Sequence, residues 1–220
     1  MAARTSMLMT TESRPDGLQD FVARNLVRAI ASGELPPGAR LSPARLAGDL
    51  GVSHIPVREA LAALEAVGQV KRIPRVGFFV AEMSTEDIED IYHWRQVLED
   101  EAHRIALSRL SGEDLDHMRE LNTAMAAAVD HGETYAELDR AFHFVPFQRA
   151  GSDHLLRFIT HLWDAAGRYH GVVLARVDRS VLQQHHDALL LAFDARDVNS
   201  VNALFAAHRG HTLDAIRQVS

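Results

Sequence analysis

The sequence has 220 residues, 47% apolar and 24% charged, which is typical of a globular protein with one large or two modest domains and excludes a disordered, collagen-like or disulfide-stapled chain. It contains no cysteine, which excludes disulfides, thiolate metal sites and cysteine nucleophiles and agrees with a reducing cytoplasm. The net charge of −7 is unevenly spread. Residues 1–81 hold 10 basic and 7 acidic side chains, whereas the remainder holds 13 basic and 23 acidic side chains and 12 of the 13 histidines. This asymmetry predicts two domains with different partners.

Residues 1–17 are polar and are predicted to form a flexible arm. They hold no apolar core of signal-peptide length, and no later segment has the roughly 18 uninterrupted apolar residues of a membrane helix. We therefore expect a cytoplasmic chain without a membrane partner.

Residues 18–81 have the pattern of a winged helix-turn-helix domain. Ser42 is the expected N-cap of its second helix, and Gly51 predicts the stop of that helix and a tight turn into the third. The predicted elements are three helices and a β-hairpin, at about 18–32, 42–50, 56–67 and 70–80.

The third helix of this domain is predicted to enter the major groove of DNA, whose width matches that of a helix. Ser53 is placed to cap this helix, and His54 and Arg58 would reach base edges. The hairpin carries basic side chains that suit contacts with phosphates: Lys71, Arg72 and Arg75. Any one of these basic residues could equally be a solvated surface charge, so the prediction depends on the ordered pattern.

Residues 82–220 have no strand signal and predict an all-α bundle of six or seven helices. Ser111 followed by Asp114 resembles a capping box at the start of the second of these helices. Aromatic residues at apolar positions are predicted to be core: Trp94, Phe142 and Trp163. The helices are expected at about 84–110, 111–132, 133–150, 152–176, 180–195 and 197–218.

Four side chains in this bundle form a candidate metal site. Asp139 and His143 lie four residues apart on one predicted helix and share a face, while His186 and His208 lie on two later helices. A carboxylate with three imidazoles suits a first-row divalent ion. Spacing alone is weak evidence here, because a chain this rich in histidine contains such pairs by chance, and core or surface histidines are the alternative.

Other residues of the bundle have two interpretations each. His185 projects away from His186 and is expected beside the site or at the surface, whereas His211 shares a face with His208 and could compete as a ligand. Arg95 lies among apolar neighbours and could bind the carboxylate of an effector; the alternative is an ion pair with Glu99.

The first domain closely resembles the GntR family of transcription regulators, which implies an operator in double-stranded DNA. That family commonly has an arginine where this chain has His54, and another where it has Ala44, next to Arg45; Arg58 matches. The resemblance therefore implies DNA contacts by Arg45 and Arg58, with an altered operator sequence. It rests on Leu35-Pro-Pro-Gly-Ala-Arg-Leu-Ser42, Leu46-Ala47, Gly51-Val-Ser53, Pro56-Val-Arg-Glu-Ala-Leu61, Leu64-Glu65 and Gly77-Phe-Phe-Val80.

The second domain resembles the FCD-type ligand domain of the FadR subfamily. In that domain an Asp-x-x-x-His pair is followed by two histidines on the last helices, and Asp139, His143, His186 and His208 occupy all four positions. The resemblance implies a bound divalent ion such as Zn²⁺, Ni²⁺, Mn²⁺ or Fe²⁺. Tyr92-x-x-Arg95 and Leu98-Glu99 also match.

These resemblances imply a homodimeric regulator, expected to be a repressor, on a pseudo-palindromic operator. A small carboxylate effector bound at the metal and Arg95 would control its affinity for DNA. Two alternatives remain at this point: a regulator that senses the metal itself, and a metal-dependent enzyme in which the ion activates water.

Overall fold

The computed structural model describes residues 17–128, 133–169 and 177–217, so the predicted arm lies almost entirely outside the described residues. The chain divides into two compact units between Met83 and Ser84.

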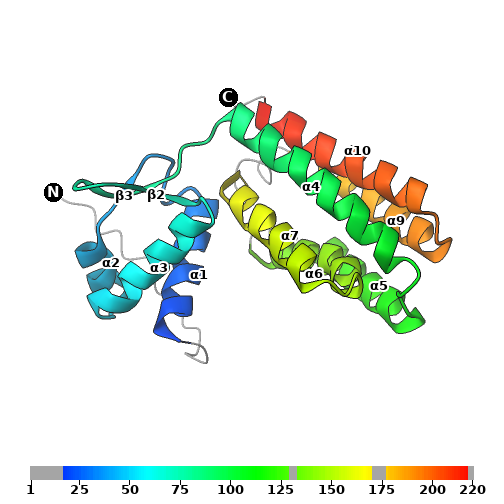
Figure 1. Cartoon of the computed structure of the whole chain (residues 1–220), viewed down its shortest axis with the longest axis horizontal. Helices are drawn as coiled ribbons and strands as arrows, with labels where there is room; N and C mark the ends of the chain where they lie inside the picture. Colours follow the sequence, from blue (N-terminus) through cyan, green and yellow to red (C-terminus); the bar gives the residue numbers. More distant parts are fainter. Residues whose placement is uncertain (1–16, 129–132, 170–176, 218–220) are drawn as a thin grey trace. The chain divides into compact units, whose positions relative to one another are not determined.

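The first unit is a winged helix-turn-helix (Figure 1). Its strands form an antiparallel sheet in the order β1-β3-β2. Sequence reasoning predicted the β2-β3 hairpin but missed β1, because a two-residue strand carries no periodicity; Arg40 pairs with Phe79. The elements are α1 (Leu18–Ala31), β1 (Arg40–Leu41), α2 (Pro43–Leu50), α3 (His54–Ala66), β2 (Val70–Ile73) and β3 (Gly77–Val80).

The turn between α2 and α3 has the expected signals. The Ser42 side chain accepts a hydrogen bond from the Arg45 amide at the start of α2, and Gly51 ends that helix with φ of 63°. Glycine adopts this left-handed conformation without a steric penalty. Helix α3 begins at His54, two residues earlier than predicted, since proline is tolerated in a first turn and Pro56 lies there.

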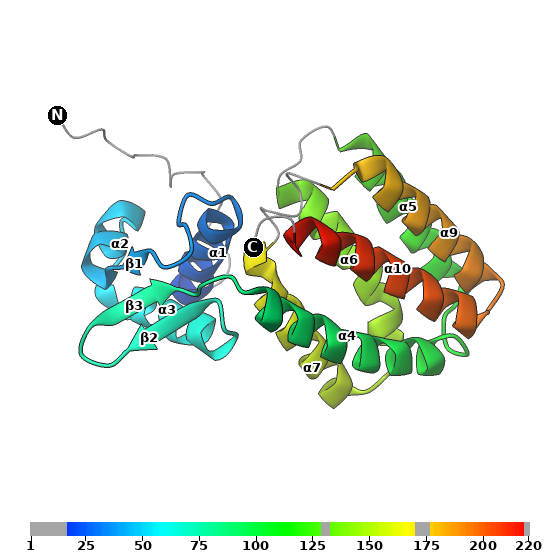
Figure 2. The ribbon, with the colours of Figure 1, turned by 90° about the horizontal axis from the view of Figure 1, so that it is seen from above.

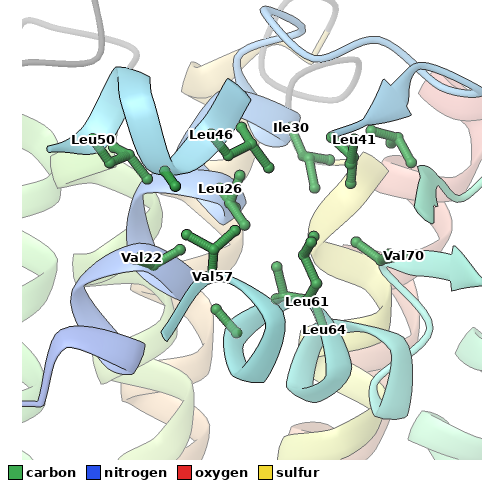
Figure 3. Close-up of a cluster of buried hydrophobic side chains, with 13 residues drawn as sticks. Val22, Leu26, Ile30, Leu41, Leu46, Leu50, Val57, Leu61, Leu64 and Val70 are labelled. Carbon is green, nitrogen blue, oxygen red and sulfur yellow. The ribbon is translucent and has the colours of Figure 1, made fainter. Parts of the chain in front are cut away.

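The core of the first unit forms where the three helices meet the sheet. Figure 3 shows Val22 and Leu26 of α1 facing Val57 and Leu61 of α3, with Leu46 of α2 above them. All five side chains are buried. This packing holds α3 in place, because its inner face is apolar while its outer face is exposed.

The second unit is all-helical, with six α-helices and one 3₁₀ turn in its described residues. Helix α4 packs against α6, α7 and α10, and α9 packs against α5 and α10 (Figures 1 and 2). This agrees with the predicted bundle. The elements are α4 (Thr85–Ala106), α5 (Gly112–Ala127), α6 (Glu133–Arg149), α7 (Asp153–Ala166), η1 (Gly167–Tyr169), α9 (Arg179–Asp194) and α10 (Val198–Arg217).

Local signals in this unit mostly match their structures. Ser111 and Asp114 form the predicted capping box of α5. Phe142 and Trp163 are buried as predicted, but the prediction for Trp94 was wrong, because its side chain is 50% exposed on α4. None of the helices in the described ranges is long and apolar enough to span a bilayer.

Candidate functional site

Three helices bring the four candidate ligands together. Helix α6 carries Asp139 and His143, α9 carries His186, and α10 carries His208. Asp139 Oδ1 lies 3.5 Å from His143 Nε2 and 3.2 Å from His186 Nε2, and these two nitrogens are 3.4 Å apart. One ligand atom from each of the four residues lies within 4.8 Å of the others. Residues 69 positions apart in the chain thus converge on one point.

This cluster is closed on one side by aromatic rings. His143 and His186 are buried, and their rings lie 5.1 Å from Phe205 and 5.0 Å from Phe142 respectively. Asp139 keeps 18% of its side chain exposed. The cluster is therefore packed against the core on one side and accessible from the side of Asp139.

The protonation states suit a cation. Burial, followed by the neighbouring imidazoles, lowers the pKa of His208 well below its usual value, and burial also lowers that of His143. Burial alone would raise the pKa of Asp139, but His143 and His186 outweigh burial and hold that pKa well below its usual range. A carboxylate faces imidazoles that resist protonation, which is the form in which these groups bind metals.

The spacing of the donors fits a first-row divalent ion. Ligand atoms about 2.1 Å from an ion lie about 3.0 to 3.4 Å from each other in octahedral or tetrahedral geometry. The observed separations among Asp139, His143 and His186 are 3.2 to 3.5 Å, close to this range, and the His208 donor lies within 4.8 Å of the others. The donor set combines one carboxylate oxygen with imidazole nitrogens, so the residues present fit such an ion.

A small cavity of about 50 Å³ adjoins the cluster. Ligand pockets commonly measure about 300 to 1,000 Å³, so only a small molecule fits here without movement of the walls. Besides Asp139 and His208, its walls include Tyr92, Arg95, Tyr135, Trp163 and Arg209.

Of the two interpretations that the sequence left open for Arg95, the structure shows the ion pair with Glu99. Its Nε donates a hydrogen bond of 2.8 Å to Glu99 Oε1, so the ion pair exists. Its guanidinium carbon lies 3.9 Å from the centre of the Trp163 ring, and the side chain also lines the cavity. Within the described residues, the two Nη atoms of Arg95 have no hydrogen-bond partner, which leaves donors available to an anion.

The Arg95–Glu99 pair belongs to a buried cluster whose other members, Trp163 and Arg209, the sequence did not predict. Glu99 is fully buried and accepts hydrogen bonds from Trp163 Nε1 at 2.8 Å and from Arg209 Nη1 at 2.5 Å. Burial tends to raise the pKa of Glu99, but Arg95 and Arg209 outweigh burial and lower it to about 2. Arg209 follows the ligand His208, yet no local signal revealed its partner, which lies 110 residues away.

The DNA-reading candidates lie on the outer surface of the first unit. His54 and Arg58 are exposed on α3. Arg45 is 75% exposed on α2, where it pairs with Asp49 at 3.5 Å. Ser53 occupies the N-cap position of α3, but the predicted capping bond was wrong, because its side chain makes no cap hydrogen bond and is exposed.

The wing presents the other basic residues. Lys71, Arg72 and Arg75 are all exposed on β2 and the following turn, where Arg75 has φ of 65°. Sequence reasoning missed Arg40 in β1, whose Nη2 donates to the Val76 carbonyl oxygen at 3.1 Å and so links β1 to the tip of the wing.

Comparison with known proteins identifies the family. Residues 18–80 match the family model "Bacterial regulatory proteins, gntR family", and residues 90–211, more than half of the chain, match the "FCD domain" model. The chain belongs to the GntR family. This GntR-family regulator is 30% identical to the HTH-type transcriptional regulator McbR of Escherichia coli, over 80% of this chain and 82% of McbR.

Other relatives agree. The regulator is 29% identical to the HTH-type transcriptional repressor GlaR of E. coli, over 89% of this chain and 94% of GlaR. The structure of E. coli McbR/YncC covers 93% of this chain and 100% of its own, with a TM-score of 0.79 and 27% identity. These relatives are transcription regulators, so the chain is a DNA-binding regulator and not an enzyme, and the enzyme alternative is excluded.

Within the described ranges, the remaining histidines do not join the four-residue cluster. His154 and His161 are exposed on α7, and His170 lies outside the described residues. His211 is not part of the cluster, and its ring lies 6.0 Å from that of His185.

Proposed function

We propose that this regulator is a repressor whose affinity for its operator is set by a small carboxylate bound at a divalent metal centre. Asp139, His143, His186 and His208 would hold the ion, which supplies two positive charges and open coordination positions for an anion. Zn²⁺, Ni²⁺, Mn²⁺ and Fe²⁺ all suit this donor set. The observation that carries the proposal is the convergence of these ligands beside the free Nη donors of Arg95.

On DNA, α3 would lie in the major groove. His54 and Arg58 would contact base edges there, and Ser53, Arg45 and the basic wing residues Lys71, Arg72 and Arg75 would contact phosphates. Two copies would place their recognition helices about 34 Å apart on a pseudo-palindromic operator. Such a regulator would act in the cytoplasm, where its operator lies.

The second unit offers a surface for pairing two copies. Trp94 and Val97 on α4 are 50% and 47% exposed, and Phe158 on α7, which packs against α4, is 61% exposed. Exposed large apolar side chains on neighbouring helices are typical of protein interfaces. Because α4 follows directly on the DNA-reading unit in the chain, a homodimer that pairs through α4 would constrain both recognition helices.

The dimer is tested by sedimentation of Phe158→Glu and Trp94→Glu. Both variants are expected to be monomers, because a charge on a dry apolar interface is costly. Leu191→Glu is the matched control, since Leu191 is 71% exposed on α9, away from this pair of helices. A dimer that persists in the first two variants and dissociates in the control would place the interface elsewhere.

Occupation of the cavity would reach the DNA-reading unit through the first turn of α4. The Tyr169 hydroxyl, at the end of the segment that carries Trp163, accepts a hydrogen bond of 3.1 Å from the Ser84 amide and lies 3.1 Å from the Ser84 carbonyl oxygen. It also donates to Asp87 Oδ2 at 2.8 Å, and Arg168 pairs with the same carboxylate. We call Ser84, Asp87, Arg168 and Tyr169 the α4 latch. A ligand that moves α7 would shift this latch, and the coupling free energy in such systems is typically about 1 to 3 kcal/mol.

The proposal is tested by metal analysis and operator-binding assays on wild type, His143→Ala and Arg95→Gln. Wild type is expected to hold one tightly bound ion, to be stabilised against heat by a small carboxylate and to lose operator affinity with it. His143→Ala should lose the ion and the response, and Arg95→Gln should keep the ion but bind the carboxylate weakly. His154→Ala, which removes an exposed histidine, is the control.

The same assays distinguish a direct metal sensor. If operator affinity follows the free metal concentration and no carboxylate changes it, the ion itself is the signal. A wild-type protein that binds no ion at all would overturn the proposal.

A further inference from the structure

Two histidines beside the main cluster form a second pair. His185 on α9 and His211 on α10 face each other across helices that pack together, with ring centroids 6.0 Å apart and ring planes at 86°. His185 also lies 5.8 Å from the ring of His208. Both members of the pair are half-buried, so the pair borders the main cluster and is partly accessible to solvent.

The spacing of this pair suits a shared ion. An imidazole bound through one nitrogen places its ring centre about 3.2 Å from the ion, because the bond is about 2.1 Å and the ring adds about 1.1 Å. Two such rings on one ion are then about 5 to 6 Å apart. The observed 6.0 Å lies at the upper end of this range, and the imidazoles of the main cluster lie 5.0 to 5.3 Å apart.

In the described part of the chain, one nitrogen of each ring is buried without a partner. His185 Nδ1 and His211 Nε2 are buried atoms without a hydrogen bond in the part of the chain that the structure describes. Buried polar atoms are almost always paired in folded proteins, so two orphan nitrogens on adjacent rings are donors available to a ligand.

A carboxylate lies near the pair. Asp178 is the N-cap of α9, and its side chain is exposed. Hydrogen bonds from Ser180 lower the pKa of the Asp178 carboxyl, which lies close enough to His211 for an electrostatic interaction. Its negative charge favours a cation at the neighbouring imidazoles.

We propose that His185 and His211 hold a second divalent ion, next to the main metal centre and more open to solvent. Paired imidazoles prefer borderline ions such as Zn²⁺, Ni²⁺ and Cu²⁺ over Mg²⁺ or Ca²⁺. With two protein nitrogens and an exposed position, this site binds more weakly than the four-ligand centre and exchanges its ion faster. An ion bound there would be held by His185, which directly precedes a ligand of the main centre in the sequence.

The test is equilibrium dialysis of the full chain, first stripped with a chelator, against Zn²⁺, followed by metal analysis. His185→Gln/His211→Gln is expected to bind one equivalent fewer than wild type. Asp139→Asn/His143→Gln should also lose one equivalent, and combining all four changes should lose two. His154→Gln/His161→Gln, which changes two exposed histidines of α7, should bind as wild type does.

The outcomes separate this site from the main centre. Equal binding by wild type and His185→Gln/His211→Gln, with both folded by circular dichroism, would overturn the second site. Loss of an equivalent in that variant alone, with none lost in Asp139→Asn/His143→Gln, would support the second site and refute the main one. If Mg²⁺ at the same concentration displaces the second Zn²⁺, the binding is merely electrostatic and the proposal is wrong.

Discussion

Glu99 connects the stability of the helical unit to its cavity, and the conservative change Glu99→Gln tests that connection. The carboxylate has no exposed surface and contacts two guanidinium groups and the Trp163 indole. Its pKa falls from 4.5 to about 2 in the folded protein. A difference of about 2.5 pH units corresponds to about 3 kcal/mol of stability at neutral pH.

The amide of Glu99→Gln can keep hydrogen bonds but not the charge, so two arginines remain buried with less compensation. Breaking a buried pair in this way typically costs about 3 to 5 kcal/mol. We therefore expect the free energy of unfolding of the helical unit to fall by about 3 kcal/mol. In wild type this contribution is complete above pH 4.5 and is lost as the pH falls toward 2, because the unfolded carboxyl takes up its proton first.

The assay is urea unfolding followed by tryptophan fluorescence. The chain has two tryptophans, Trp94 and Trp163, and both lie in the helical unit, so the signal reports that unit alone. Glu101→Gln is the matched control, since it removes an exposed carboxylate from the same helix. That carboxylate is paired with Arg104, so the control also breaks an ion pair, but one at the surface. If the two variants have equal stability, the buried cluster does not support the fold and the reasoning about Arg95 fails.

Three further predictions concern pH, DNA and signalling. Burial lowers the pKa of His103 from 6.5 to about 4, so the unfolded chain takes up the proton first. About 3 kcal/mol of stability is therefore lost as the pH falls from 6.5 to 4. In metal-free protein, His103→Leu should flatten this part of the pH profile of the free energy of unfolding, measured with urea. Arg58→Ala should weaken operator binding by about 1 to 3 kcal/mol and relax the base preference, whereas Arg75→Ala should weaken binding to any DNA equally and lower the salt slope by about one in filter-binding assays. Tyr169→Phe removes the hydroxyl of the α4 latch, so the operator affinity should respond less to the carboxylate while the bound metal, measured by elemental analysis, stays unchanged; an undiminished response would exclude the latch as the route.

The sequence alone determined the features that depend on neighbours in the chain. Ser42 and Gly51 mark the two ends of α2, and Ser111 and Asp114 cap α5. Asp139 and His143 share one face of a helix. The members of each pair lie close to each other in the sequence. Such interactions can be predicted from the spacing of residues along the chain. The family motifs extended this prediction to His186, which no spacing rule connects to α6.

Only the tertiary structure decided which distant groups meet. The pairing of Arg40 with Phe79, the burial of Arg209 against Glu99 and the contact of His185 with His211 all join separate elements. Helical periodicity states that a residue lies on one face of its helix, but not which helix covers that face. Trp94 shows the consequence. Its apolar character predicted burial, but half of its surface is left uncovered by the described residues.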